Sequence, residues 1–388
     1  MPQYPFTFPK ISGKLIKRLN RFAVEVEVEG RQERAYLPNT GRLWELLLPG
    51  TTLLLSPALS RGKLPYTVLA CRKGAHFVLL HTHLTNEIAH RLIDEGRIPP
   101  YRDYHVVKRE PAYGRHRFDL LLEHRRNGRP FYLEIKNNTL FESRTAMFPG
   151  AITERGATHL RLLKELASEN VGGGCLFMIM SPQVKYFLPA YHIDYRFSQT
   201  FLDVKNFIRV DAFALGFDSD FTEVITIEPV KIPHRFIEDE LQDRGFYLLL
   251  LELAEPKTIT PQDNRRVLCK EGYYVCVGKA EKELSREAAR HKQKSKKKKR
   301  PIDHLTAEAE MITPIPIITG EPLAPGLVDR LGPLADRRIA GPFSGNGIIG
   351  PLFYFSANPL LNRGFIDLIQ DSRIIQPEQR LRTGGYLP

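Results

Sequence analysis

The chain has 388 residues, of which 42% are hydrophobic, 10% aromatic and 26% charged. This composition is typical of folded globular proteins and excludes a disordered or low-complexity chain, and the length indicates two or three domains. The 56 basic and 44 acidic residues give a net charge of +12, which favours a polyanionic partner: nucleic acid first and, from charge alone, a membrane surface second.

The cysteine spacing, the first residues and the apolar runs indicate the cellular compartment. No Cys-x-x-Cys pair is present, so neither a zinc site nor a disulfide framework is indicated. The first residues lack a basic stretch followed by an apolar run, so no signal peptide is expected. The longest apolar run, Phe246 to Leu253, is far too short for a membrane span. We therefore expect a cytoplasmic protein that does not enter a membrane.

Residues 1–84 are predicted to be all β. The segment Phe22 to Gly30 alternates apolar and acidic residues, as a half-exposed strand does. Tyr66 to Cys71 and Phe77 to His81 are further strand candidates, and Leu43 to Leu48 is predicted to be a short helix or strand. This series of short strands predicts a small closed barrel of the OB type.

Polar residues in two turns of this barrel are candidate phosphate contacts. The residues are Asn20, Arg21, Asn39, Thr40 and Arg42. Barrels commonly bind single-stranded nucleic acid through basic grooves and stacked aromatic rings. Asn-Thr-Gly also forms a turn without any ligand, so both interpretations stay open.

Residues 85–236 are predicted to form a mixed sheet with flanking helices. The apolar runs 118–123 and 131–136 enclose an Asn-Gly dipeptide at Asn127, which predicts a β-hairpin. A helix is expected from Thr153 to Glu169, because apolar residues recur there at helical spacing. The following elements are then expected: a helix end at Gly172 to Gly174, a buried strand from Cys175 to Met180, a helix starting near Asp194, and strands at 209–215 and 223–227.

The hairpin carries the main candidate for chemistry. Glu134 and Lys136 are two apart in a strand and therefore point to the same face. A register that places Asp119 beside Glu134 makes a carboxylate pair with a lysine next to it. Such a pair can bind Mg²⁺, and the lysine can hold a water aimed at phosphorus. The alternative is a solvated cross-strand pair with no chemistry.

Residues 237–362 are predicted to form a third domain, and residues 363–388 a tail. Strands are expected at 246–253 and 273–277, followed by a helix from Glu281 to His291. The basic run from Lys292 to Arg300 comes next. Its lysines are either phosphate contacts or a solvated loop. The candidate contacts within it are Lys296, Lys297, Lys298 and Lys299.

Residues 11–233 resemble the sugar fermentation stimulation protein A family. The resemblance rests on these motifs: Leu15 to Phe22, Pro38 to Leu43, Arg117 to Leu121, Glu134 to Leu140, Phe148 to Gly156 and Phe187 to Ala190. The family is described as an OB-fold domain joined to a restriction-endonuclease-like domain, with DNA binding and nuclease activity. The resemblance implies that Asp119, Glu134 and Lys136 are the acidic and basic residues of the nuclease signature, with Asp119 and Glu134 as metal ligands.

The same resemblance implies roles for Glu154 and Arg155, which begin the predicted helix behind the hairpin. Glu154 is a further catalytic candidate and Arg155 a candidate phosphate contact, although an acid in a first turn also simply favours the helix dipole. Two positions depart from the family pattern. Tyr36 stands where a histidine is common, and Gly150 where an aspartate is common, so activity is in doubt if that aspartate serves the site.

The third domain resembles a divergent member of the GIY-YIG nuclease superfamily. Its motifs place Tyr247, Tyr274, Arg286 and Glu321 in a degenerate site. Counting back from Arg290-His291, the arginine expected on the helix falls on Glu287, and Arg286 is one place early. One residue is about 100° on a helix, so Arg286 cannot simply replace it. We therefore expect this domain to be inactive and to serve as a binding module.

The sequence thus favours a metal-dependent nuclease that uses Mg²⁺ or Mn²⁺ and binds DNA, with RNA as a further option. The alternative is a DNA-binding protein, such as a transcriptional regulator, that keeps the fold without catalysis. The third interpretation is a protein of the membrane surface, argued from charge alone. The oligomeric state is not indicated.

Overall fold

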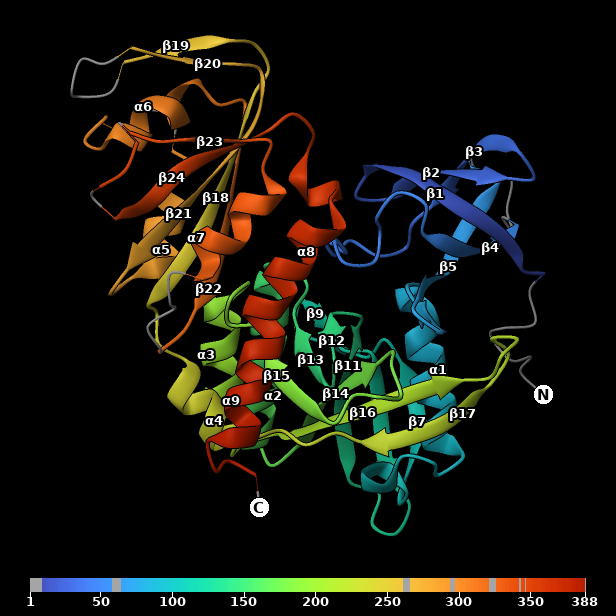
Figure 1. Cartoon of the computed structure of the whole chain (residues 1–388). Helices are drawn as coiled ribbons and strands as arrows, with labels where there is room; N and C mark the ends of the chain where they lie inside the picture. Colours follow the sequence, from blue (N-terminus) through green and yellow to red (C-terminus); the bar gives the residue numbers. More distant parts are fainter. Residues whose placement is uncertain are drawn as a thin grey trace. The chain divides into compact units, whose positions relative to one another are not determined.

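A computed structural model of the chain describes residues 9–57, 64–260, 266–293, 297–320, 326–341, 343–345 and 347–387. Contacts between residues divide the chain into two compact units. Unit 1 comprises residues 1–190, 196–234 and 387–388, and unit 2 comprises residues 191–195 and 235–386. The elements carry the labels of Figure 1. Among the described residues, no helix is long and apolar enough to cross a membrane.

Unit 1 begins with a closed barrel. Its strands are β1 (Ile11–Asn20), β2 (Ala23–Val28), β3 (Arg31–Tyr36), β4 (Thr52–Pro57), β5 (Tyr66–Lys73) and β6 (His76–Leu79). They pair in the order β3-β2-β1-β4-β5-β6, and a parallel pairing of β3 with β5 closes the barrel. In β2 the valines are buried, whereas Glu25 and Glu27 are partly or fully exposed. The predicted OB-like barrel is confirmed.

The prediction of a helix or strand at 43–48 is wrong. This segment is a series of turns, although Leu46 and Leu47 are buried. Leu43 has a φ of 53°, a left-handed conformation that neither a helix nor a strand can continue through. Arg18 holds the preceding loop, because its guanidinium donates to the carbonyl oxygens of Gly41 at 2.7 Å and of Arg42 at 2.6 Å.

The second part of unit 1 is a six-stranded mixed sheet. Its strands are β7 (Tyr104–Arg109), β10 (Leu120–His124), β11 (Pro130–Asn138), β14 (Gly172–Ile179), β16 (Arg209–Phe217) and β17 (Val224–Pro229). They pair in the order β17-β16-β14-β11-β10-β7. Strand β11 is antiparallel to β10 and parallel to β14, and β14 is parallel to β16. The predicted mixed sheet and the Asn-Gly hairpin between β10 and β11 are both confirmed.

Three helices accompany this sheet (Figure 1): α1 (Thr82–Asp94), α2 (Glu154–Ser168) and α3 (Tyr195–Val204). Helix α1 packs against β7 and β11, and α2 packs against β14. The predicted helices at 153–169 and near 194 are confirmed, whereas α1 was not predicted. Smaller elements are η1 (Pro99–Tyr101), β8 (Ala112–Tyr113), β9 (His116–Arg117), β12 (Phe141–Glu142), β13 (Thr145–Phe148) and β15 (Tyr186–Pro189).

The prediction that the glycines at 172–174 end an element is wrong, because they belong to strand β14. The ring of Phe131 on the neighbouring strand fills the space that a side chain would need. A Cβ at Gly172 would lie 2.6 Å from Phe131 Cδ2, and one at Gly174 would lie 2.9 Å from Phe131 Cζ. These glycines therefore allow a large ring of β11 to pack against β14.

Unit 2 is built on an antiparallel sheet in the order β22-β18-β21-β24-β23. Its strands are β18 (Gly245–Leu253), β21 (Gly272–Ala280), β22 (Met311–Ile318), β23 (Arg337–Ile339) and β24 (Ile348–Phe355), with a separate ribbon of β19 (Lys257–Ile259) and β20 (Val267–Cys269). The helical elements are α4 (His234–Glu240), α5 (Leu284–Arg290), α6 (Pro301–Glu308), α7 (Gly326–Leu331), η2 (Gly332–Leu334) and η3 (Pro359–Leu361).

Residues 363–383 of the segment expected to be a tail are helical and packed. It comprises α8 (Arg363–Gln370), the π-helical turn η4 (Asp371–Ile375) and α9 (Gln376–Thr383). Phe365 and Leu381 are fully buried, and Arg380 forms a bidentate ion pair with Glu240 of α4 at 2.6 and 2.8 Å. The π-helical turn between α8 and α9 rotates the apolar face of α9 relative to that of α8. The apolar residues of the segment therefore follow no single period in the sequence.

Candidate active site

The hairpin brings the predicted triplet together. Strands β10 and β11 pair with Leu120 opposite Leu133, so Asp119 and Glu134 are the next positions across the ladder. Glu134 and Lys136 lie two apart in β11, and the Lys136 ammonium contacts Glu134 Oε1. The sequence therefore places all three functional groups at one end of the hairpin, as the alternation of strand side chains requires.

Asp119 is held by two donors. Its Oδ2 accepts from the backbone N–H of Ile135 at 2.6 Å, and its Oδ1 accepts from the side chain of Asn86 on α1 at 2.7 Å. Burial and the neighbouring Glu134 carboxylate raise the pKa of Asp119 to about 6, although Lys136 opposes the rise. Two acids that share a buried site commonly repel in this way.

Glu134 is almost fully buried, with 6% of its side chain exposed. Burial favours its neutral form, but Lys136 and His159 outweigh that effect and lower its pKa. His159 Nδ1 lies 2.7 Å from Glu134 Oε1, the same oxygen that Lys136 contacts. The other oxygen, Oε2, is buried and has no hydrogen-bond partner among the residues that the structure describes.

Lys136 places one positive charge beside the two acids. Burial favours its neutral amine, but Glu134 and Asp119 outweigh burial and raise the pKa of Lys136, so the ammonium form is retained. The thiol of Cys175, opposite Glu134 on β14, is fully buried, and burial raises its pKa. Cys175 is therefore a packing residue and no nucleophile.

The donor set suits a hard divalent cation. Within the described part of the chain, no group of three His, Cys, Asp or Glu side chains is placed to hold a metal ion by itself. Mg²⁺ and similar ions bind through one or two carboxylates and keep several waters. Glu134 Oε2 has no hydrogen-bond partner among the described residues and Asp119 lies opposite Glu134 across the ladder, so the two carboxylates suit a hard divalent cation.

Two contacts of this site were missed by sequence reasoning: Asn86 on α1 and His159 on α2. Each lies far from the hairpin in sequence, and neither forms part of a recognisable motif. Arg155 Nε donates to His159 Nε2 at 3.3 Å, so the predicted phosphate contact is linked to the triplet through His159. Glu154 is exposed at the start of α2, and among the described residues no hydrogen bond or ion pair joins it to the triplet.

The barrel candidates divide into two kinds. Arg21 and Thr40 are exposed, and Arg42 is half-buried with its guanidinium 4.9 Å from the centre of the Trp44 ring. Asn39 is buried, and its side chain accepts from Gly41 N at 2.9 Å and donates to Leu80 O at 3.2 Å. These bonds favour a turn-forming role for Asn39 over contact with nucleic acid.

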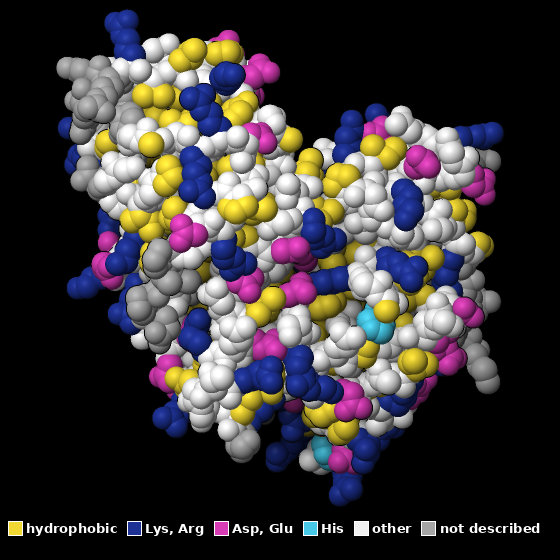
Figure 2. Space-filling view, viewed as in Figure 1, with side chains coloured by type: hydrophobic (Ala, Val, Ile, Leu, Met, Phe, Trp, Pro, Cys, Tyr) yellow, Lys and Arg dark blue, Asp and Glu magenta, His cyan; other side chains and the backbone are white. Residues whose placement is uncertain are grey.

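The basic surface is spread out. On the face drawn in Figure 2, Lys and Arg side chains are scattered and do not gather into one patch. In the basic run, Lys297, Lys298 and Lys299 are exposed, whereas Lys296 lies outside the described residues. This arrangement is suited to contact with a long polyanion through many weak sites.

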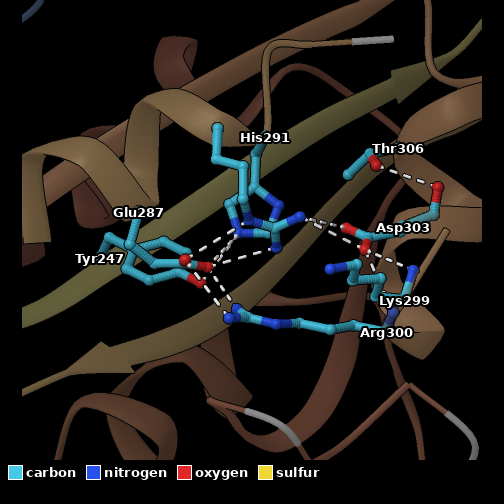
Figure 3. A network of polar contacts seen from close by, with 8 residues as sticks. Tyr247, Glu287, His291, Lys299, Arg300, Asp303 and Thr306 are labelled. Carbon is cyan, nitrogen blue, oxygen red and sulfur yellow. Dashed lines mark hydrogen bonds and ion pairs between the residues drawn. The ribbon is translucent and has the colours of Figure 1, made fainter. Parts of the chain in front are cut away.

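The third predicted domain holds a second polar cluster around Tyr247 (Figure 3). The Tyr247 hydroxyl lies 2.9 Å from His291 Nε2, and both side chains are fully buried. Glu287 approaches His291 at 3.4 Å and pairs with Arg290 at 3.3 Å and with Arg300. Asp303, also buried, accepts from Arg290 at 3.1 Å. Each carboxylate of the cluster is therefore paired with a guanidinium.

Tyr274 and Arg286, which were also predicted for that site, have partners outside the cluster. Tyr274 donates to Lys270 O at 2.7 Å, and Arg286 is exposed and pairs with Glu283. Glu321 lies outside the described residues. A Cβ at Gly278 would lie 1.9 Å from Tyr247 Cζ, so only glycine leaves room for this tyrosine.

Comparisons with known proteins locate the relatives of the chain. Two family models match: the SfsA N-terminal OB domain over residues 16–80 and the sugar fermentation stimulation protein RE domain over residues 83–220. A sugar fermentation stimulation protein homolog from Clostridium tetani (strain Massachusetts / E88) is 34% identical over 221 residues, which cover 57% of this chain and 95% of the relative. One from Caldanaerobacter subterraneus subsp. tengcongensis is 36% identical over 193 residues, which cover 49% of this chain and 83% of the relative.

A solved structure is also similar. Pyrococcus furiosus SfsA in complex with Ca²⁺ matches with a TM-score of 0.55 and 26% sequence identity. The match covers 60% of this chain and 99% of that chain.

The first prediction concerns Asp119 without metal. Its folded-state pKa of about 6 lies above the ordinary value of 3.8, so folding favours the protonated form, and that stabilisation is lost as pH rises through 6. Asp119→Asn imitates the neutral acid. We expect it to raise the free energy of unfolding by about 2 kcal/mol at pH 8 in chelator, with the difference shrinking towards zero between pH 6 and pH 4.

Urea unfolding across this pH range measures the effect. Glu123→Gln, which changes another acid of the same hairpin, is the matched control and is expected to have little effect at any pH. Addition of Mg²⁺ is expected to stabilise the wild type and not Asp119→Asn. A variant that is less stable than the wild type at pH 8 in chelator would contradict the burial argument.

The second prediction concerns Glu287. Contacts with His291, Arg290 and Arg300 lower its pKa to about 2, so the stability that it contributes is present above pH 4.5 and is lost as pH falls towards 2. Glu287→Gln leaves two guanidinium groups without their carboxylate. We expect a loss of about 2 kcal/mol at pH 7, a value that allows for partial exposure of the cluster.

Chemical denaturation of the full chain at pH 7, pH 5 and pH 3 measures this loss of unfolding free energy. The loss should be the same at pH 7 and pH 5 and smaller at pH 3. Glu283→Gln on the same helix removes an exposed pair and should cost almost nothing. Equal losses for the two variants would show that the cluster is as weak as a surface pair.

Proposed function

This chain belongs to the sugar fermentation stimulation protein family, and we propose that it is a DNA-binding protein that hydrolyses phosphodiester bonds with Mg²⁺ or Mn²⁺. One observation carries the proposal. Glu134 Oε2 is buried and has no hydrogen-bond partner among the described residues, Asp119 lies opposite Glu134 across the hairpin, and the buried Lys136 ammonium contacts the other oxygen, Oε1. An unsatisfied buried carboxylate oxygen is costly, so a ligand that satisfies it is favoured.

In this proposal Asp119 and Glu134 hold the cation. When bound, the cation supplies positive charge to the phosphate oxygens and lowers the pKa of a coordinated water. Asn86 and the Ile135 N–H fix the Asp119 carboxylate through hydrogen bonds of 2.7 and 2.6 Å. Lys136 keeps its proton next to Glu134 and can orient a water for attack on phosphorus. Glu154 and Arg155, at the start of α2, are proposed to support the site.

The proposed partner is DNA. The features that support it are charge and phosphate contacts, which would serve RNA equally well. The net charge of +12 favours a polyanion, and the exposed Lys297, Lys298 and Lys299 supply phosphate contacts without reading sequence. Arg21, Thr40 and Arg42 are proposed to add contacts from the barrel. The Ca²⁺ complex of the Pyrococcus furiosus relative supports divalent-cation binding by this chain.

A second candidate function is DNA binding without catalysis. Gly150 favours it, because members of the family commonly have an aspartate at that place. A side chain at Gly150 would meet nothing within 4 Å, so packing does not require the glycine. The third predicted domain stays outside the catalytic proposal, since its resemblance to the GIY-YIG superfamily remains a prediction and each carboxylate in its cluster is already paired.

The third prediction tests catalysis. Labelled single- and double-stranded DNA and RNA are incubated with the full chain and Mg²⁺ or Mn²⁺. We expect cleavage that chelator abolishes and that falls at least about 100-fold in Asp119→Ala and in Lys136→Ala, because each removes charge used in the transition state. Glu123→Ala on the same hairpin is the matched control and should cut like the wild type.

Each variant is first checked for folding by circular dichroism and thermal unfolding. Equal cleavage by the wild type and Asp119→Ala would mean that a contaminant cuts the substrate. If no substrate is cut while DNA is still bound, the non-catalytic function is supported.

The fourth prediction tests the basic run. Because each neutralised phosphate releases counterions, the logarithm of the binding constant falls with the logarithm of salt concentration in proportion to the phosphates contacted. Changing Lys297, Lys298 and Lys299 together to Gln should lower this slope by about 2 to 3 and weaken binding of all sequences alike. Fluorescence anisotropy in chelator, which prevents cleavage, measures the slope.

Lys282→Gln, at an exposed lysine outside the run, is the control and should change the slope by less than about 0.5. An unchanged slope in the triple variant would place the phosphate contacts elsewhere on the surface.

A further inference from the structure

His159 is buried beside Glu134 and packs against an aromatic ring. It lies on α2, only 1% of its side chain is exposed, and its ring packs edge-on against Phe118 at 5.5 Å between centroids. Phe118 immediately precedes Asp119, and its ring in turn packs edge-on against Tyr132 at 5.6 Å. The imidazole is therefore fixed against the two strands that carry the acids.

The contacts of the imidazole assign its tautomer. Arg155 Nε can only donate, so His159 Nε2, 3.3 Å away, acts as the acceptor. The ring proton is then on Nδ1, which faces Glu134 Oε1 at 2.7 Å. Among the described residues Nδ1 forms no hydrogen bond of standard geometry, so its approach to Oε1 is a short contact between a dipole and a charge.

We infer that His159 is a positioning residue for Glu134 and that, together with Lys136, it reserves Glu134 Oε2 for a divalent cation. The His159 imidazole and the Lys136 ammonium both approach Oε1, and Oε2 has no hydrogen-bond partner among the described residues. The Nδ1 proton of His159, which faces Oε1, restrains rotation of the Glu134 carboxylate. The exposed Arg155 donates to Nε2 and so keeps the proton of the imidazole on Nδ1. The inference rests on the proposed function only in naming the cation.

A plain packing role for His159 is the competing explanation, and it makes different predictions. If the ring only fills space, an apolar side chain of similar size preserves cation affinity. If the Nδ1 proton is needed, affinity depends on a donor at that place. Asn carries an amide nitrogen close to the position of Nδ1, whereas Leu keeps the volume without any donor.

The fifth prediction follows. Mn²⁺ binding to the full chain is measured by electron paramagnetic resonance and by calorimetry, with no substrate present. We expect His159→Leu to bind Mn²⁺ about 10-fold to 100-fold more weakly than the wild type, as is usual when an outer partner of a metal ligand is lost. His159→Asn should stay within about 3-fold of the wild type, because it restores a donor to Oε1. Asp119→Ala should abolish binding.

The outcomes separate the two hypotheses. Wild-type Mn²⁺ affinity in a folded His159→Leu variant would overturn the positioning role and leave the proposed function intact. Absence of Mn²⁺ binding by the wild type would overturn the metal-dependent function itself. Nitrogen-15 spectra of the imidazole, assigned by comparison with His159→Asn, give an answer in either case. A proton on Nδ1 in the wild type supports the role, and a proton on Nε2 overturns it, even if His159→Leu fails to fold.

Discussion

The proposed chemistry depends on the burial of two carboxylates and one ammonium group at the end of a single hairpin. Burial alone favours the neutral form of each group, and the balance differs between the two acids. Lys136 outweighs burial at Glu134 and lowers its pKa, whereas burial and the adjacent Glu134 raise the pKa of Asp119 to about 6. One negative charge is thus compensated by the fold and the second is not. A bound cation would compensate the second charge, which is why the site fits a metal better than a structural ion pair.

The hairpin could be predicted because all its determinants are local. Asn-Gly fixed the turn, and the alternation of strand side chains placed Glu134 and Lys136 on one face. Asn86 and His159, which contact the two acids, could not be predicted. They belong to helices α1 and α2, which lie before and after the hairpin in the sequence. Their alignment depends on the packing of α1 against β11 and of α2 against β14. A single sequence contains no local signal for such contacts.

The errors in the fold have similar causes. Leu43 to Leu48 has the composition of a regular element, but the left-handed backbone at Leu43 keeps that residue out of a helix or strand, and the residues after it form a turn at 44–46. The C-terminal segment lacks a helical period because a π-turn divides α8 from α9, and its packing depends on Arg380 reaching Glu240, which is 140 residues away in the chain. In both segments, one conformational feature or one distant contact overrides the pattern of the side chains.

The two polar clusters of the molecule show why function is assigned to one and not to the other. In the cluster of Figure 3, Glu287 pairs with the guanidinium groups of Arg290 and Arg300, and Asp303 pairs with that of Arg290, so both oxygens of each carboxylate are engaged. A phosphate would have to break these pairs before it could bind. At the hairpin, by contrast, one oxygen of Glu134 is buried and has no partner in the part of the chain that the structure describes, so a cation could bind there without displacing a contact of that oxygen. The same residue types therefore form paired charges in one unit and a candidate binding site in the other, because among the described residues only the hairpin arrangement leaves a carboxylate oxygen unsatisfied.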